Sequence, residues 1–534
     1  MRCSGARSLR SVSYNPACLT FGSNDERLDW SESGRSDDSG LPHETGSARR
    51  PTRKIACGTY PIKRNRWVSP CESREITRTL SDSRPSSRTL WCEALENALS
   101  LVGVPVDSAL QLYREERRDL VVDLNPDGSS TTVQTGWDGL AARDRAKTGR
   151  LFFRSSPVLE DAQRLVRLCL DSAFRLPIDS KGGCRPAPEP ILPDLAQLHD
   201  SISVIAEEVK RVCPGAVAVA RGVLFEQQVL VARPGQAVAA DTRRGLRLRA
   251  ECRLARGGKR ASAVSETVLS PADPDQRAGL ELAAAALAER LDQRLHAEEA
   301  PSGRMPVVLA PGVGGVLVHE IVGHALEADV ELTGDSWLAV LKEPVGPGEL
   351  TVLDDPRRGR GGWRIDDEGT AAGATPLLRD GLVVGRLHDL QTAARANEGP
   401  TGHGRCSSFR EPIRPRMGCT FIAPGDLRPD QVRDGIREGV YVRRMETGST
   451  DPRSGRAVFR VTDADRIRNG KVDAPLKPFL LHVEGATALA SMNRIGNDLQ
   501  FDRCVGVCHR DGQPLAISVG APTIWIGLAT VNGQ

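Results

Sequence analysis

The sequence has few aromatic residues and lacks any long apolar run. Phe, Trp and Tyr make up 4% of the 534 residues, which is too few for a base-stacking surface, and no basic stripe with interleaved aromatics occurs. The formal net charge of +3 is small and mixed. No stretch reaches the roughly 18 consecutive apolar residues that suggest a transmembrane helix. We therefore expect neither a nucleic-acid partner nor insertion into a membrane.

Paired cysteine motifs are missing as well. The 13 cysteines are odd in number and scattered, with no CxxC pair. The first residues, MRCSGARSLRS, carry charge but lack the apolar segment of a secretory signal. This combination predicts reduced thiols in the cytoplasm, because disulfide frameworks belong to oxidising compartments.

The length of the chain predicts two or three domains. Residues 1–88 are rich in Ser, Arg, Gly and Pro, so we expect a disordered arm there. Residues 89–176 predict an N-terminal α+β domain with antiparallel strands, and residues 177–194 a Pro/Gly-rich linker. Residues 195–304 predict a meander of five short strands between two helices. Residues 305–534 predict a strand-rich C-terminal catalytic domain, so the expected fold class is α+β.

The most informative stretch runs from residue 307 to 329, VVLAPGVGGVLVHEIVGHALEAD. Its first apolar residues predict a buried strand, a Pro-Gly pair ends that strand, and an apolar-rich helix follows. The helix contains His319, Glu320 and His324. Two imidazoles and a carboxylate beside a water-excluding wall indicate a catalytic metal site.

The spacing of the two histidines leaves two geometries open. They are five residues apart, one more than in the H-E-x-x-H pattern. On a regular helix of 3.6 residues per turn, five residues rotate through roughly 140°, so the two rings would diverge. A π-type bulge would bring them together, and Gly323, which lacks a Cβ, would tolerate the distortion. In a regular helix the metal face would instead be Glu320, His324 and Glu327, at positions i, i+4 and i+7.

HEIVGHALEAD resembles the HExxxH motif of the TldD/PmbA family of metallopeptidases, on the TldD side. Other motifs of that family follow in the same order: IDDEGT at 365–370, PTGHGR at 400–405, GNDL at 496–499 and VGVC at 505–508. Upstream, GLAARDRAKTG at 139–149 resembles the family's N-terminal domain. The family's TldE/PmbA partners lack the HExxxH ligands, so the intact motif implies the active, TldD-like type.

The resemblance implies that His319, His324 and Cys508 bind one Zn²⁺ per active subunit, because VGVC matches the family's third-ligand motif. From its spacing alone, Cys508 is more simply a buried cysteine. Three protein ligands would leave the fourth position to water, as in catalytic zinc sites. Glu320 would then be the general base.

Four further residues are candidates for orienting the ligands or contacting the substrate: Glu327, Asp329, His403 and Arg405. The first two would hydrogen-bond the imidazoles. His403 and Arg405 lie in a Gly-rich stretch and would contact a substrate carbonyl or carboxylate. The family commonly has Asn at the position of His403, so this chain departs from the pattern there.

Together these features predict a zinc-dependent peptidase. The resemblance implies that it hydrolyses extended or unfolded peptides, in leader removal, peptide maturation or protein turnover. The resemblance implies substrates bound by strand addition to a sheet edge. It also implies a heterodimer with a TldE/PmbA-like subunit, or a homodimer. Two alternatives stay open: a non-hydrolytic partner or peptide-binding subunit, and a metal-dependent hydrolase of non-peptide amides.

Overall fold

The computed structural model describes residues 87–104, 109–125, 129–144, 150–170, 195–267, 276–339, 341–502 and 506–533. The predicted arm lies outside these residues except for its last two, which begin a helix, and the predicted linker at 177–194 also lies outside them. Residues 85–534 form one compact unit. Within the described residues, no helix combines the length and the apolarity needed to span a lipid bilayer.

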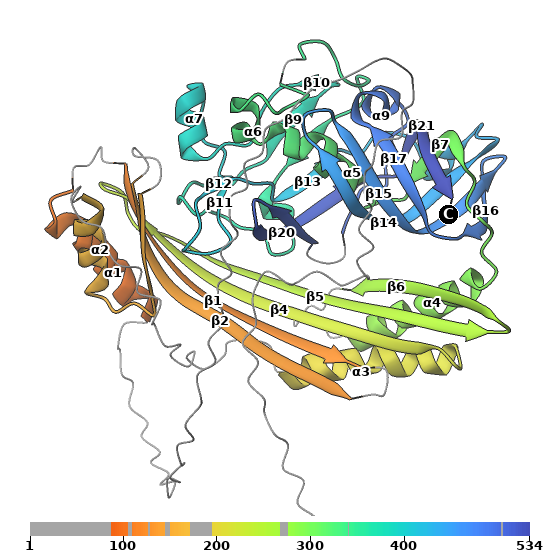
Figure 1. The fold of residues 1–534 in the computed structure, drawn as a ribbon, viewed down its shortest axis with the longest axis horizontal. Coiled ribbons are helices and arrows are strands. Elements are labelled where there is room, and N and C mark those ends of the chain that lie inside the picture. Colours follow the sequence, from red (N-terminus) through yellow and green to blue (C-terminus); the bar gives the residue numbers. More distant parts are fainter. Residues whose placement is uncertain are drawn as a thin grey trace, which may run out of the picture. The chain divides into compact units, whose positions relative to one another are not determined.

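One six-stranded antiparallel sheet contains all the strands before residue 300 in the described chain (Figure 1). Its order is β3-β2-β1-β4-β5-β6. The strands are β1 Leu110–Leu124, β2 Ser130–Asp144, β3 Arg150–Ser155, β4 Val217–Ala232, β5 Ala239–Arg256 and β6 Lys259–Thr267. Because β1 pairs with β4 over most of its length, the predicted boundary between 89–176 and 195–304 divides strands of a single sheet. The two segments predicted at 89–176 and 195–304 thus contribute strands to the same sheet.

The meander predicted as five short strands is three long ones, β4 to β6. One of these strands, β5, continues through a glycine. Gly245 lies in β5 opposite Phe225 of β4, and a Cβ on Gly245 would come within 2.1 Å of the Phe225 ring. The glycine therefore makes room for a large cross-strand neighbour instead of ending the strand.

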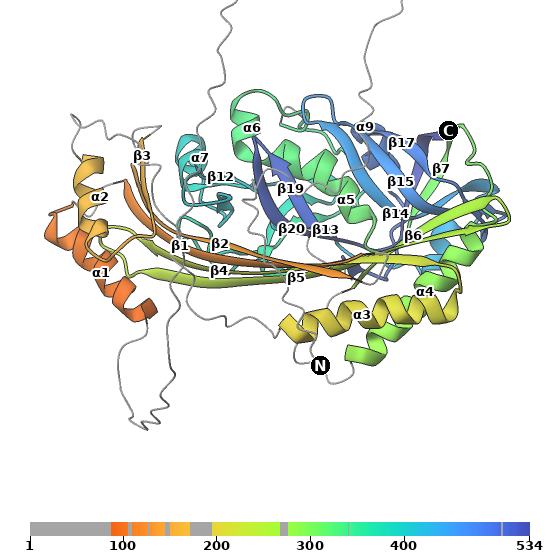
Figure 2. The same cartoon turned by 60° about the horizontal axis from the view of Figure 1, so that its bottom comes forward.

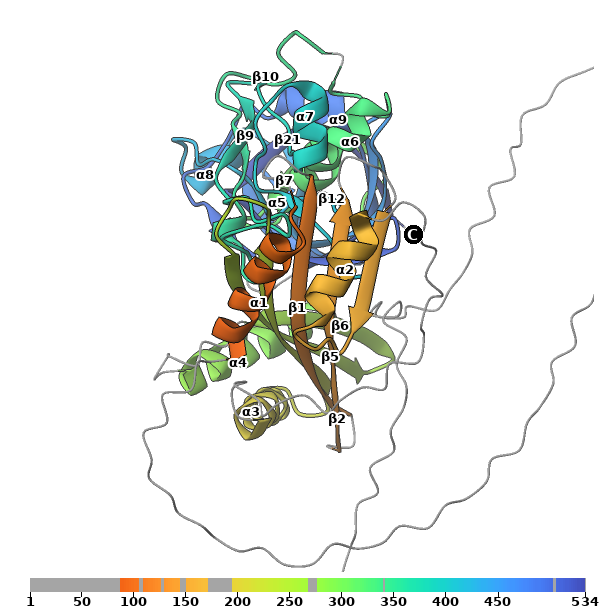
Figure 3. The same cartoon turned by 90° about the vertical axis from the view of Figure 1, so that its left-hand side faces the viewer.

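Helices cover one face of this sheet, two near each end (Figures 2 and 3). They are α1 Ser87–Leu101 and α2 Asp161–Leu170 at one end, and α3 Leu195–Val212 and α4 Gln276–Arg294 at the other. Leu112 packs with the first pair and Leu248 with the second. The opposite face carries Tyr113 and Val231, which pack against Phe409 of the C-terminal domain. The alternation of buried residues along each strand produces these two faces.

The C-terminal domain contains one sheet of six strands and one of seven. In the first, β14-β7-β21-β17-β15 closes on itself because β14 also pairs with β15, and β16 extends it. In the second the order is β10-β9-β8-β13-β20-β18, with β19 also paired to β20. The strands of the first sheet are β7 Gly303–Leu309, β14 Glu438–Asp451, β15 Arg456–Arg468, β16 Lys471–Leu476, β17 Phe479–Glu484 and β21 Ile524–Gly533. Those of the second are β8 Val352–Asp354, β9 Thr375–Arg379, β10 Leu382–Val383, β13 Cys419–Ile422, β18 Gln500–Phe501, β19 Gly506–Arg510 and β20 Gln513–Ala521.

The other elements of this domain are short. They are the pair β11 Gly404–Arg405 and β12 Arg414–Pro415, and the helices α5 Gly314–Val318, α6 Ala328–Leu332, α7 Leu390–Ala396, α8 Pro429–Arg433 and α9 Gly485–Ser491. The mixture of helices and mainly antiparallel strands confirms the predicted α+β class.

The predicted buried strand before the histidines is β7, and α5 follows it. Helix α5 contacts strands of both sheets, β13 and β20 in one and β14 in the other. Two glycines at its start permit this approach, since a Cβ on Gly315 would lie 2.5 Å from the Gly520 nitrogen. The helix that carries the histidines is thus embedded between the sheets, where water is largely excluded.

Candidate metal centre

The residues His319–Gly323 form a π-helical turn that continues α5 directly. The His324 N–H donates to the carbonyl of His319, five residues back. A turn that closes on the fifth residue places side chains five apart above one another. The bulged geometry, one of the two that the spacing allowed, is therefore confirmed, and the regular helix is not the conformation of this chain.

Side chains from outside the helix bond the carbonyls around the π turn. Trp337 donates from Nε1 to the carbonyl of Ile321 at 2.9 Å. Ser336 donates from Oγ to the carbonyl of Ala325 at 2.5 Å. Carbonyls that lose their helical partner inside a protein are costly unless another donor replaces it. These two donors therefore stabilise the irregular helix.

Gly323 has a role that differs from the predicted one. Its backbone is helical, with φ −57° and ψ −56°, so it needs no unusual conformational freedom. A Cβ at this position would lie 1.9 Å from the Met417 sulfur. The missing side chain thus permits close packing of the π turn against Met417.

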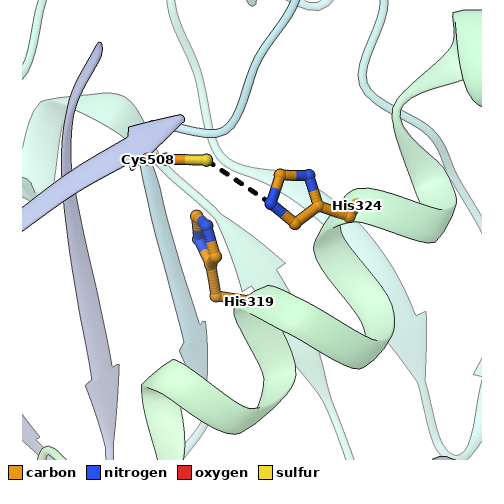
Figure 4. Close-up of side chains that lie close together, drawn as sticks. All are labelled: His319, His324 and Cys508. Atoms are coloured by element: carbon orange, nitrogen blue, oxygen red, sulfur yellow. Dashed lines mark hydrogen bonds between the residues drawn. The ribbon is translucent and has the colours of Figure 1, made fainter. Parts of the chain in front are cut away.

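Three donor groups converge at this turn (Figure 4). The Cys508 sulfur lies 3.4 Å from His324 Nε2, and the rings of His319 and His324 have centroids 5.0 Å apart. The ligand atoms of the three residues all lie within 4.8 Å of one another, and all three residues are buried. At zinc bond lengths of about 2.3 Å to sulfur and 2.0 Å to nitrogen, two tetrahedral ligand atoms are roughly 3.5 Å apart. The observed sulfur–nitrogen distance fits a shared metal ion.

The charge state of Cys508 suits a metal ligand, whereas His324 has to lose a proton to bind a metal. Burial alone would raise the pKa of the Cys508 thiol, but His324 and His319 lower it well below its usual value. For His324 the effects are reversed: burial alone would lower its pKa, but Cys508 and Glu327 raise it well above its usual value. A thiolate is the form of cysteine that binds metals, and a bound metal displaces the proton of the imidazole. Among the described residues the buried His319 Nδ1 has no hydrogen-bond partner, so the cluster holds an unused polar atom.

Glu327 fixes the orientation of the His324 ring. Its Oε2 lies 3.0 Å from His324 Nδ1, which leaves Nε2 to face Cys508. Arg510 donates to the same oxygen at 2.9 Å, and Arg416 Nε lies 3.6 Å from Oε1. Burial alone would raise the pKa of Glu327, but His324 and the two arginines lower it to about 2. Glu327 is therefore a charged acceptor that selects the ring nitrogen available to a metal.

Glu320 lies within the π turn, beside the cluster. Its Oε2 is 4.0 Å from His324 Nε2, which is longer than a hydrogen bond. The residue is 7% exposed. The carboxylate is thus next to the position of a shared metal, while the nitrogen of His324 that faces Cys508 stays unblocked by it.

Comparison with known proteins identifies the family. Residues 302–533 match the family model described as the PmbA/TldA metallopeptidase C-terminal domain. The "Metalloprotease TldD homolog" of Buchnera aphidicola subsp. Schizaphis graminum is 34% identical over 242 residues, covering 45% of this chain and 50% of that protein. The homologue of the same name from Haemophilus influenzae is 32% identical over 321 residues, covering 58% of this chain and 66% of that protein.

Over residues 302–533 the chain belongs to the PmbA/TldD family. It spans about half the length of most of the curated relatives it matches. A protein of Saccharolobus solfataricus named "Zinc metalloprotease TldD homolog" is 29% identical over 250 residues, which cover 46% of this chain and 56% of that protein.

Solved structures share the fold at low sequence identity. TldE from Thermococcus kodakarensis has a TM-score of 0.64 and 16% identity, covering 82% of this chain and 100% of that one. A putative modulator of a DNA gyrase from Thermotoga maritima has a TM-score of 0.63 and 16% identity, covering 83% and 100%. This likeness concerns the fold alone, and it includes the N-terminal sheet as well as the C-terminal domain.

Two further PmbA/TldD motifs in this chain bind each other. His403 Nε2 lies 3.1 Å from Asp354 Oδ1, Arg405 Nε donates to Asp367 Oδ2 at 3.0 Å, and the Gly404 N–H donates to Asp366. His403 and Arg405 are buried. Both side chains bond to carboxylates of the described chain and lie outside the three-residue cluster, and their predicted contact with a substrate stays a prediction.

Asp329 is connected to the cluster through Arg510, which also bonds Glu327. Two hydrogen bonds, of 2.9 and 2.8 Å, join its carboxylate to that guanidinium, whereas the expected bond to an imidazole belongs to Glu327. Sequence analysis missed Arg510 and Arg416. Arg510 follows Cys508 by two positions in β19, so the alternation of a strand could have placed both on one face. No local pattern connects Arg416 with the helix that it approaches.

Proposed function

We propose that this protein is a zinc-dependent peptidase in which His319, His324 and Cys508 hold the metal. The π turn is the observation that carries the proposal, because it brings two histidines five residues apart to one buried thiol. Two imidazoles and a thiolate suit zinc, and one relative has zinc in its name. The PmbA/TldD membership supports a metallopeptidase.

When bound, zinc supplies a Lewis acid that polarises the scissile carbonyl and lowers the pKa of a water molecule. Glu320 accepts the proton of the attacking water and transfers it to the leaving amine. Glu327 keeps His324 Nε2 directed toward Cys508, and Arg510 keeps Glu327 charged. The buried position of Glu320 and the apolar helix around it limit competition from bulk water.

Strand β19 suits the binding of an extended peptide. Among the described strands it pairs with β20 alone. His509 lies opposite Pro514, which has no N–H to give, so the backbone groups of Val507 and His509 point away from β20. A peptide added along that edge would pass beside Cys508. We therefore propose extended or unfolded peptides as substrates, in leader removal, maturation or turnover.

We further propose that the protein works with a TldE/PmbA-like subunit or as a homodimer. The fold it shares with a TldE supports a common architecture for the two partners. The scattered cysteines support a reducing compartment such as the cytoplasm.

The test is metal analysis of the purified protein together with digestion of a mixture of unfolded peptides, followed by mass spectrometry. We expect about one zinc per chain and peptide cleavage that a chelator abolishes. Stoichiometric zinc with no cleavage, alone or with a TldE-like subunit, would favour a peptide-binding subunit. Hydrolysis of small amides without peptide cleavage would favour the other alternative.

A further inference from the structure

A cavity of about 470 Å³ opens where the six-stranded sheet meets the end of α4 and the turn between β16 and β17. Its volume is in the range of small-molecule sites. Residues from β4 to β6, from α4 and from the C-terminal domain line it together. None of these lining residues is a ligand candidate for the metal or touches one in the contacts described above.

The lining combines apolar surface with positive charge. Val217, Leu254 and Pro478 contribute apolar surface, and among the described residues no Asp or Glu lines the cavity. The charged lining residues are all cations: Arg253, Arg260, Arg294 and Lys477. Two of them have partners outside the lining, since Arg253 pairs with Glu251 at 2.8 Å and Lys477 pairs with Glu299. The cavity therefore keeps an excess of positive charge.

Arg294 is the most buried of these cations, at 8% exposure. Within the part of the chain that the structure describes, no hydrogen bond or ion pair joins its guanidinium to another group. The nearby carboxylates serve Arg290, one turn earlier on α4, which bonds Asp463 at 2.5 Å and Asp465 at 2.6 Å. Burial lowers the pKa of Arg294; attraction to Asp463 and Asp465 opposes this shift, and repulsion from Arg290 adds to it.

A nearly buried guanidinium that no carboxylate of the described residues bonds directly is costly, so its position needs an explanation. The C-terminal end of a helix does favour cations, and Arg294 is the last residue of α4. An exposed arginine side chain at the end of α4 would gain the same stabilisation from the helix dipole. This effect does not account for a nearly buried arginine at the wall of a cavity whose other charged residues are also cations.

We propose that this cavity binds a small amphipathic anion, a phosphate or carboxylate group on a short apolar chain. Arg294 and Arg260 contact the anionic group, and the apolar chain lies against Val217 and Pro478. Since Pro478 belongs to the C-terminal domain and Val217 to the sheet, the bound anion stabilises the junction between them. The proposal does not depend on peptidase activity.

The test uses the full chain, with octyl phosphate, octanoate, inorganic phosphate and octanol as probes in calorimetry and thermal unfolding. We expect saturable binding of one or both amphipathic anions and a rise in Tm with their concentration. Inorganic phosphate should bind more weakly, and octanol should not bind. The stronger of the two anions identifies the head group. Octanol binding as tightly as the anions, or no saturable binding of either anion, would overturn the proposal.

Two variants locate the site. Arg294→Met keeps the apolar stem and removes the charge, so anion binding should weaken about tenfold or more. Its Tm without ligand should equal or exceed that of the wild type, because an unpaired buried charge is gone. Arg260→Gln, on the edge strand β6, should also weaken binding and leave Tm unchanged, which keeps the test valid if Arg294→Met folds poorly.

The matched control is Arg256→Gln. Arg256 lies near the same end of the sheet, is exposed, pairs with Asp292 and does not line the cavity. Its substitution should leave anion affinity unchanged. Wild-type affinity in both Arg294→Met and Arg260→Gln, or an equal loss in Arg256→Gln, contradicts the proposed site.

Discussion

His324 Nδ1 lies 3.0 Å from Glu327 Oε2, and this contact decides which nitrogen of the ring faces Cys508. Glu327 is in turn bonded by Arg510, two positions after Cys508 in β19. The strand that supplies the thiol therefore also positions the carboxylate that orients the imidazole. A change in the register of β19 would disturb both groups at once.

Glu327→Ala should keep zinc but weaken its binding by about 10–100-fold, since it removes a group that orients a ligand and not the ligand itself. Competition with a chromophoric chelator measures the affinity. Glu331→Ala is the control, because Glu331 lies on the adjacent α6 and pairs with Arg386. Complete loss of zinc from Glu327→Ala would mean that the carboxylate binds the metal directly.

His319→Ala and Cys508→Ala should each lose most of the bound zinc, because each removes one of only three protein bonds to the metal. Elemental analysis after gel filtration measures the metal content per chain. Cys419→Ala is a matched control, since Cys419 is also a buried free cysteine but lies in β13 outside the cluster. Full zinc occupancy in His319→Ala would rule out the proposed ligand set.

Glu320→Gln should retain about one zinc per chain while peptide turnover falls by about two to four decades, the usual weight of general-base catalysis. The substitution preserves the shape of the side chain and removes its proton acceptor. Zinc content and cleavage rate should be measured on the same preparation. Loss of the metal together with activity would instead indicate that Glu320 is a ligand.

Arg243→Met should destabilise the protein by about 3–5 kcal/mol, the usual cost of breaking a buried ion pair. Arg243 Nη1 donates to Asp367 Oδ1 at 2.6 Å with both side chains buried, and this bond joins the six-stranded sheet to the C-terminal domain. Urea unfolding measures the change. Arg244→Gln is the control, because Arg244 is exposed and pairs with Glu226. This substitution should lower the free energy of unfolding by no more than about 1 kcal/mol. Equal destabilisation by the two substitutions would show that the Arg243–Asp367 pair contributes no more than an exposed ion pair.

The stability difference between wild type and Arg243→Met should depend on pH. Burial would raise the pKa of Asp367, but Arg243 and Arg405 lower it below its usual value of 3.8. A carboxyl with a depressed pKa stabilises the fold above its unfolded pKa and loses that contribution as pH falls through the folded pKa. The difference should therefore be constant near neutrality and narrow below about pH 4. A difference that grows in acid would contradict this assignment.

Local patterns in the sequence predicted much of the protein. The apolar run before the histidines predicted β7, and the antiparallel strands predicted within residues 89–176 include β1 and β2. The residue types at positions 319, 320 and 324 indicated a metal site. Their spacing narrowed the helix to two conformations, since the side chains of a helix point in directions set by residue number.

Only the tertiary structure decided between those conformations. The π turn depends on Trp337 and Ser336, which bond carbonyls of the helix, and on Met417, which occupies the space above Gly323. The pairing of β1 with β4 likewise joins segments on either side of the predicted linker. Hydrogen-bond partners and strand edges that are distant in sequence fix these features, and no periodicity within a segment encodes which distant segment will meet it.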